Sequence, residues 1–295
     1  MRSGCRSGLA VAGLLLAAAC GGGGAEADLW RPSAAASWQW QLQGAVNTGY
    51  DVDVYDIDLV RTSPDVFERL RSDGRRVVCY FSAGTWETFR GDRAPPEEAV
   101  GKPLVDFPDE RWLDIRHAGV RTRIIGQLDL ARERNCDGVE PDNVDGFAND
   151  TGFDLSAADQ LAFNRFLAAE AHERDLAVGL KNDLDQVAEL AGDFDFAVNE
   201  QCHEFAECEA LVPFVDARKP VFNAEYHDTF RRDPAPMCDA SQRLGLETLV
   251  LPTQLDDSFR ISCDDRLQQV AARRPRLEHD REKVRVAARD ATMRA

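Results

Sequence analysis

Short apolar runs with β-branched residues alternate with longer amphipathic stretches along most of the chain. Runs of about four to eight residues between turn-forming residues are typical of buried strands, and apolar residues at three- and four-residue spacing are typical of helices. Their alternation is the pattern of a parallel sheet in an α/β fold. The predicted strands are 38–42, 52–57, 77–81, 113–116, 138–142, 177–181, 196–200, 221–225 and 249–254.

These elements favour a single (β/α)8 barrel, the TIM-barrel fold. Nine strands are one more than such a barrel contains, so one of the first four is an extra strand or a loop segment. The domain is predicted to span 37–272, a common size for one α/β barrel. The predicted helices are 64–72, 120–134, 157–174 and 184–190, with Ser63 and Ser156 as candidate N-caps of the first and third.

A doubly wound sheet is the competing architecture, and it normally carries a cofactor-binding motif. No Gly-x-Gly-x-x-Gly follows a predicted strand, and no Gly-x-x-x-x-Gly-Lys-Ser/Thr loop occurs. The Gly-x-Ser-x-Gly elbow of serine hydrolases is also missing. These absences favour the barrel and predict a protein that uses no cofactor.

The first residues have the features of an export signal. Arg2 and Arg6 precede an apolar stretch at 9–16, and small residues then lead to Cys20. This arrangement is typical of a lipoprotein signal peptide, with Cys20 as the lipidated residue. The apolar stretch is shorter than the roughly 20 residues that a membrane-spanning helix needs.

We therefore expect 1–19 to be the signal peptide and 20–36 to be a flexible glycine-rich tether. Ordinary cleavage near Ala25 and an uncleaved anchor are the alternatives. The protein is expected to be exported as a membrane-anchored lipoprotein, or otherwise secreted. The charge-dense tail 273–295 is predicted to be a surface helix or disordered, and we assign it no function.

The formal net charge of -17 bears on the choice of partner. A surface that binds phosphates is basic, so nucleic acid is not an expected partner. An acidic protein suits a cationic polymer, although acidity that only maintains solubility explains the charge equally well. We expect a monomer that meets the membrane only through its lipid anchor.

Six cysteines remain after Cys5 in the signal segment and the lipidation candidate Cys20 are set aside, and an even number in an exported chain favours disulfides. A zinc site is not predicted, because no Cys-x-x-Cys occurs and the five histidines are scattered. The candidates are Cys202 with Cys208, Cys238 with Cys263, and finally Cys79 and Cys136 as either a third pair or two buried thiols.

Acidic side chains end two of the predicted strands. Side chains alternate along a strand, so Glu140 and Asp142 share one face, with Asn143 beside them as a hydrogen-bond donor to a sugar hydroxyl. The alternative for Asp142 and Asn143 is a turn with ordinary Asx caps. Glu140 is harder to explain in this way, because an unpaired carboxylate inside a strand is costly to bury.

Glu200 ends the run Phe-Ala-Val-Asn-Glu, and Lys181 ends a strand between the two acidic ones. Such a cation can hold one carboxylate ionised while the other stays protonated, which is the division of labour in acid/base catalysis on a sugar. The alternatives are a rim glutamate and a structural counter-ion. The further candidates for lining the same cleft are Tyr80, Asp56, Asn182, Glu225 and Tyr226.

Taken together, the motifs resemble glycoside hydrolase family 114. The resemblance extends over about 38–254, and it implies a TIM barrel with an acidic cleft that cleaves a cationic, partly deacetylated α-1,4-linked galactosamine polymer. It also implies that Asp142 and Glu200 are the catalytic acids. Glu140 stands where the family often has Asp, so it is either a substrate-binding residue or the acid itself. The motifs are VVCYFSAG at 77–84, WLDIR at 112–116, CDGVEPDNVDG at 136–146, GLKN at 179–182 and NEQC at 199–202.

The favoured hypothesis is hydrolysis through an oxocarbenium-like transition state, with Asp142 as nucleophile or base and Glu200 as proton donor. Retention of anomeric configuration is implied by the resemblance only. A second hypothesis is a polysaccharide-binding lipoprotein without turnover. A third is a metal-dependent hydrolase, which the lack of a histidine cluster weakens.

Overall fold

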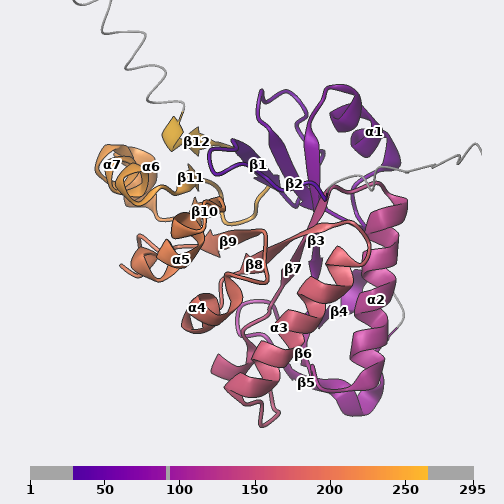
Figure 1. The fold of residues 1–295 in the computed structure, drawn as a ribbon. Coiled ribbons are helices and arrows are strands. Elements are labelled where there is room, and N and C mark those ends of the chain that lie inside the picture. Colours follow the sequence, from indigo (N-terminus) through magenta and orange to yellow (C-terminus); the bar gives the residue numbers. More distant parts are fainter. Residues whose placement is uncertain (1–28, 91–93, 265–295) are drawn as a thin grey trace, which may run out of the picture.

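The computed structural model describes residues 29–90 and 94–264, and within them the (β/α)8 barrel is confirmed (Figure 1). The predicted signal peptide, Cys20 and the charged tail 273–295 lie outside these residues. Within the described part, no helix has the length and apolar character that crossing a membrane requires.

Eight parallel strands follow one another in chain order around the curled sheet. Most of them match the predicted ranges to within two residues, since each is an apolar run that ends at a polar residue. The eight are β1 (Trp38–Gln41), β2 (Val54–Asp58), β3 (Arg76–Ser82), β7 (Gly138–Asp142), β8 (Ala177–Lys181), β9 (Phe196–Glu200), β10 (Val221–Glu225) and β11 (Glu247–Val250).

The predicted strand 113–116 is the extra one. It corresponds to β6 (Glu110–Leu113), which lies outside the barrel in a small antiparallel sheet between β4 (Thr85–Glu87) and β5 (Val100–Pro103). The strand stops at Leu113 because the amide of His117 closes a turn on the carbonyl of Asp114 before the next helix. The small sheet is therefore an insertion between β3 and β7.

Side chains join the two ends of the barrel sheet. The short strand β12 (Ile261–Ser262) pairs antiparallel with β11. Trp38 Nε1 in β1 donates a hydrogen bond to the carbonyl of Glu247 at 2.9 Å, and an Arg260 NH group donates to the carbonyl of Trp38, also at 2.9 Å. The first contact joins β1 to β11, and the second joins β1 to the segment directly before β12.

Helices cover the outside of the sheet, with α2 and α3 side by side against β7 (Figure 1). Ser156 caps α3 through a reciprocal capping box with Asp159, as its position predicts, whereas Ser63 makes no side-chain cap to α1. The helices are α1 (Pro64–Ser72), α2 (Ala118–Glu133), α3 (Ala157–His172), α4 (Val187–Leu190), α5 (Val212–Asp216), α6 (Asp228–Arg232) and α7 (Ala235–Leu244).

Alternation along the strands creates two apolar cores. One lies between the sheet and its helices and includes Ile57, Cys79, Phe81, Val139, Val178, Phe163 and Leu167. The other fills the barrel interior and includes Trp38, Trp40, Val54, Val78, Phe196, Val198, Phe222 and Leu249. The barrel interior is thus filled with apolar side chains, and the polar residues at the strand ends lie above them.

The first described residues pack at the amino-terminal ends of the strands. Trp30 contacts the interior core and lies under the guanidinium of Arg76, the first residue of β3. Arg31 pairs at 2.7 Å with Asp195, which directly precedes β9. Asp195 also accepts hydrogen bonds from the amide of Val178 and from His172, so this end of the barrel is tied together by one carboxylate.

All six cysteines among the described residues are paired, which confirms the two pairings predicted from spacing and resolves the open third. The disulfides are Cys79–Cys136, Cys202–Cys208 and Cys238–Cys263.

Candidate active site

A single ammonium group joins three carboxylates at the carboxyl ends of β7, β8 and β9. Lys181 Nζ lies 2.9 Å from Glu140 Oε1, 3.1 Å from Asp142 Oδ1 and 3.4 Å from Glu200 Oε2. The four residues meet because each occupies an inward-facing position near the end of its strand. This is the edge of a parallel barrel where reactive groups gather.

Each outer carboxylate also receives a tyrosine hydroxyl. Tyr80 donates to Asp142 Oδ2 at 2.9 Å, and Tyr226 donates to Glu200 Oε1 at 2.5 Å. Asp142 Oδ1 accepts a further hydrogen bond from the backbone amide of Asn143 at 2.7 Å. The donors fix the orientation of both carboxylates before any substrate binds.

The chain turns sharply after each of these strands. Asn143, Asn182 and Gln201 have φ values of 59°, 48° and 63°, in the left-handed region that asparagine tolerates better than most residues. Asn182 Oδ1 accepts a hydrogen bond from the amide of Glu200 at 2.9 Å, and its Nδ2 lies 3.4 Å from Glu200 Oε2. The turn after β8 therefore positions the carboxylate on β9.

Gly84 allows the turn after β7 to approach β3. A Cβ atom at this position would lie 1.7 Å from the carbonyl oxygen of Asn143. Asn143 Nδ2 reaches across to Ser82 Oγ at 3.0 Å. The Ser-Ala-Gly sequence at the end of β3 therefore supports the turn that follows Asp142.

Burial and charge determine the protonation of the inner groups. Burial raises the pKa of Glu140 to about 7, although Lys181 opposes the rise. Burial alone would lower the pKa of Lys181, but Asp142, Glu140 and Glu200 together raise it well above its usual value. Burial and the neighbouring carboxylates also raise the pKa values of Tyr80 and Tyr226. The lysine and both tyrosines are consequently hydrogen-bond donors at neutral pH.

The site opens into a cleft of about 820 Å³. Its floor includes Trp40, whose ring centroid lies 4.7 Å from Lys181 Nζ. Among the described residues, nine acidic and three basic side chains line the cleft. The basic ones are Arg61, Lys102 and Lys181, and the acidic ones are Asp58, Glu87, Asp106, Asp109, Glu110, Asp142, Asp145, Asp150 and Glu200.

Four predicted cleft residues do not line the cleft, namely Glu140, Asp56, Glu225 and Tyr226, and Glu140 is fully buried beneath Lys181. Glu225 faces away from the barrel interior and accepts hydrogen bonds from the amide of His203 and the side chain of Asn223. Because adjacent residues of a strand face opposite sides, Glu225 and Tyr226 cannot both face inward, and it is Tyr226 whose hydroxyl reaches Glu200. Asp56 faces inward but is buried below the cleft.

Most of the cleft wall comes from residues that the strand-end argument does not reach. The loop 104–109 of the small sheet contributes six residues in a row, and Asp145, Asn149 and Asp150 follow β7. Of these missed cleft residues, only Asp58 could have been predicted from the sequence, because it shares the inward face of β2 with Asp56.

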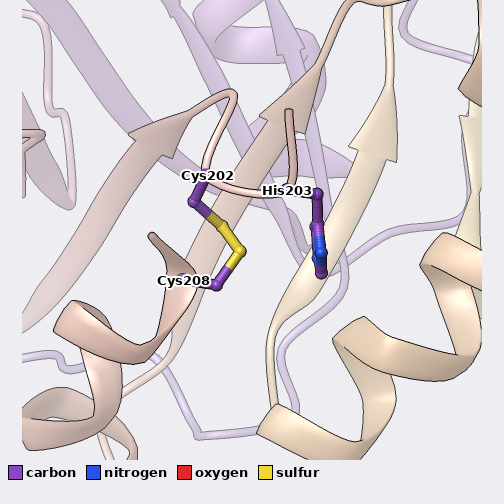
Figure 2. Close-up of side chains that lie close together, drawn as sticks. All are labelled: Cys202, His203 and Cys208. Atoms are coloured by element: carbon purple, nitrogen blue, oxygen red, sulfur yellow. A yellow bond between two sulfur atoms is a disulfide. The ribbon is translucent and has the colours of Figure 1, made fainter. Parts of the chain in front are cut away.

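The described residues contain one group of cysteine, histidine and acidic side chains close enough to share a metal ion: Cys202, His203 and Cys208 (Figure 2). The two sulfurs are joined in a disulfide, so they are not thiolate ligands. Burial also lowers the pKa of His203. This cluster closes the loop that follows Glu200.

Comparison with known proteins gives concordant results. The sequence profile of glycoside-hydrolase family GH114 matches residues 23–268. The crystal structure of Aspergillus fumigatus Ega3 in complex with galactosamine is similar with a TM-score of 0.75 at 37% identity, covering 79% of this chain and 97% of that one. The glycoside hydrolase domain of PelA from Pseudomonas aeruginosa has a TM-score of 0.57 at 15% identity, covering 77% and 98% of the respective chains. No curated protein sequence matches significantly.

The profile match covers most of the chain, and the likeness to Ega3 covers most of both proteins. The likeness to PelA concerns the fold. The chain therefore belongs to glycoside-hydrolase family GH114 and is a glycoside hydrolase built on a (β/α)8 barrel.

Proposed function

We propose that this glycoside hydrolase cleaves α-1,4-linked, galactosamine-containing polysaccharide, with Asp142 as nucleophile and Glu200 as proton donor. The observation that carries the proposal is the pair of carboxylates joined by Lys181 in one acidic cleft. Galactosamine is the ligand in the crystal structure of the similar Ega3. A protonated amine is attracted to such a cleft, because carboxylates in a recessed site focus negative potential.

The donors around Asp142 and the greater exposure of Glu200 support the two roles. Asp142 accepts hydrogen bonds from Tyr80, Lys181 and its neighbouring amide, as suits a carboxylate that attacks the sugar. Glu200 is more exposed, with 28% of its side chain accessible against 19% for Asp142, as suits a group that must reach the glycosidic oxygen. Proton transfer from Glu200 would then accompany departure of the leaving sugar.

The separation of the carboxylates favours retention. Two oxygens that contact one tetrahedral ammonium at 3.1 and 3.4 Å do not lie in line through it. They are therefore closer than roughly 6.5 Å, where the range of inverting pairs begins. NMR of the earliest product should show the anomer of the substrate, and the opposite anomer would rule out Asp142 as nucleophile.

The central experiment uses a fragment lacking residues 1–24 with partly deacetylated α-1,4-galactosamine polymer. We expect new reducing ends from the wild type, and a loss of at least about 100-fold in Glu200→Gln and Asp142→Asn. Glu207→Gln, an exposed change in the loop after β9, is the matched control and should retain activity. Polymer binding without product from any protein would instead favour a non-catalytic binding protein.

We further propose that the protein is exported as a monomer and lipidated at Cys20. The basic, apolar and small-residue sequence before Cys20 supports this proposal. Radiolabelled palmitate should be incorporated by the full chain and not by Cys20→Ser. Equal labelling of both proteins would contradict the lipid anchor, and light scattering of the fragment checks the monomer.

A further inference from the structure

Asp56 lies on the inner face of β2, next to Trp40 in the strand register. Its side chain is 1% exposed, and it is not among the residues that line the cleft. It cannot contact a polysaccharide there, so a substrate-binding role does not explain a carboxyl group at this position. A buried acid without a role would be costly to retain.

The hydrogen bonding around Asp56 is incomplete unless a proton is added. Neither oxygen of Asp56 has an N–H or hydroxyl donor, and Oε2 of Glu140 has none either. Asp56 and Glu140 nevertheless both lie buried on the strands on either side of β3, and a side-chain hydrogen bond between them is among the causes that shift the pKa of each. Two carboxylates repel, so this contact requires that one of them is a carboxylic acid.

The proton belongs on Asp56. Glu140 Oε1 accepts a hydrogen bond from Lys181 Nζ at 2.9 Å, which stabilises its ionised form. We propose that Asp56 is a positioning residue: as a neutral acid it donates a hydrogen bond to Glu140 Oε2 and thereby holds Glu140 ionised against Lys181. The proposal concerns the site of the proposed function and rests on it for the reaction.

The consequence reaches the reacting carboxylates through Lys181. Glu140 holds the ammonium from below, and the same ammonium contacts Asp142 and Glu200 above. Burial, followed by the charge of Glu140, raises the pKa of Asp56 well above its usual value, which agrees with a neutral acid. The titratable groups of the surrounding strands are Asp58 on β2, Tyr80 on β3, Glu140 and Asp142 on β7, Lys181 on β8 and Glu200 on β9.

The test compares two substitutions of Asp56. Asp56→Asn keeps an N–H donor of the same shape, so kcat should stay within about threefold of wild type and the pH profile should not move. Asp56→Ala removes the donor, so kcat should fall at least about 30-fold. The acidic limb of kcat/KM should rise by about one pH unit, because Glu140 then protonates more readily.

Equal losses in both variants, or a shifted profile in Asp56→Asn, would mean that Asp56 acts as an anion and would overturn the proposal. Unchanged activity in both would overturn it as well.

A measurement without substrate separates this inference from the proposed function. The neutral carboxylic acid band in the infrared spectrum at pH 7 should be weaker in Asp56→Asn than in the wild type by the intensity of one acid. Asp183→Asn provides the reference intensity of one acid, because burial raises the pKa of Asp183 to about 8. Persistence of the full band in Asp56→Asn would overturn the inference, whatever the polymer assay shows.

Discussion

Lys181 is the residue on which the site depends most. It is 2% exposed and serves as counter-ion to three carboxylates. Removing one partner of a buried ion pair costs about 3–5 kcal/mol, because the remaining charge is left uncompensated. Here the remaining charges are Asp142 and Glu200, which are proposed to perform the chemistry, and Glu140, which is proposed to support it.

Lys181→Met should therefore reduce kcat/KM at least about 100-fold and lower the melting temperature at pH 7. The loss of stability should be smaller at pH 5, since protonation of Glu140 then relieves the repulsion. Calorimetry at both pH values and the reducing-end assay measure these effects. Arg132→Met, which removes an exposed pair with Asp175, should change neither.

Asp183, in the turn after β8, should make the protein less stable as the pH rises. Burial is the main cause that raises its pKa from an ordinary value near 3.8 to about 8. The native state thus binds this proton more tightly than the unfolded state, so the stability present at pH 4 is lost progressively up to pH 8.

Asp183→Asn should add about 1–3 kcal/mol to the free energy of unfolding at pH 8 and almost nothing at pH 4. Urea denaturation at the two pH values measures the difference. The exposed Asp185→Asn is the matched control and should not show this pH dependence. An equal gain at both pH values would show that ionisation is not the cause.

At this scale the sequence predicts the residues at strand ends well and their surroundings poorly. The structure brings Asp142, Lys181 and Glu200 together, because each closes an apolar run of predictable phase. Glu225 is a residue that the strand-end argument predicts wrongly. Its side chain faces the opposite side of the strand from Tyr226, and that alternation, not its place at a strand end, excludes it from the cleft. The sequence also does not predict that Asp56 is buried, because its depth below the cleft depends on the packing of the whole barrel.

Among the elements, two of the three disulfides have different expected effects. Cys79–Cys136 closes a separation of 57 residues, and Cys202–Cys208 closes one of 6 directly behind Glu200. Loop-closure entropy alone gives about 4 and 2 kcal/mol respectively.

Replacing both cysteines of each disulfide by alanine should therefore rank the two variants in opposite order for stability and for activity. Loss of Cys79–Cys136 should lower the free energy of unfolding more, whereas loss of Cys202–Cys208 should lower kcat more, because that loop follows Glu200, the proposed proton donor. Urea denaturation and the reducing-end assay check the ranking. The same order in both assays would contradict a positioning role for the short loop.

The small sheet supplies an apolar rim to the cleft. Val105 and Phe107 in the loop 104–109 line the cleft and are 97% and 57% exposed. Exposed aromatic rings beside a sugar site are suited to stacking on sugar rings remote from the cleaved bond.

Phe107→Ala should reduce kcat/KM about 5- to 20-fold on long polymer and much less on short oligosaccharides. Phe205→Ala is the matched control, because Phe205 is 61% exposed and does not line the cleft. Equal losses on long and short substrates would contradict a remote binding role.

The sequence predicts the barrel strands because they are buried on both faces, which leaves continuous apolar runs. It does not predict the small sheet, whose strands are half-exposed and as short as three residues. Nor does periodicity distinguish β6 from a barrel strand, because Trp112 and Leu113 are buried in either arrangement.

For the whole molecule, the net charge of -17 and the acidic cleft have the same sign. Long-range attraction of a cationic polymer is screened by salt, with a Debye length of about 10 Å at 0.1 M. We expect kcat/KM on partly deacetylated polymer to fall about 3- to 10-fold between about 20 and 300 mM NaCl. Fully N-acetylated polymer is the control, and equal salt effects on both substrates would exclude electrostatic recruitment.

The contacts of Trp30 and Arg31 place the start of the described chain at the amino-terminal ends of the strands, so the proposed tether would join the barrel there. The cleft opens at the opposite ends of the same strands. A lipid-tethered copy would therefore stand with its closed end toward the bilayer and its mouth toward the surroundings. Such an enzyme would trim polymer that reaches the cell from outside and would spare material lying flat against the membrane.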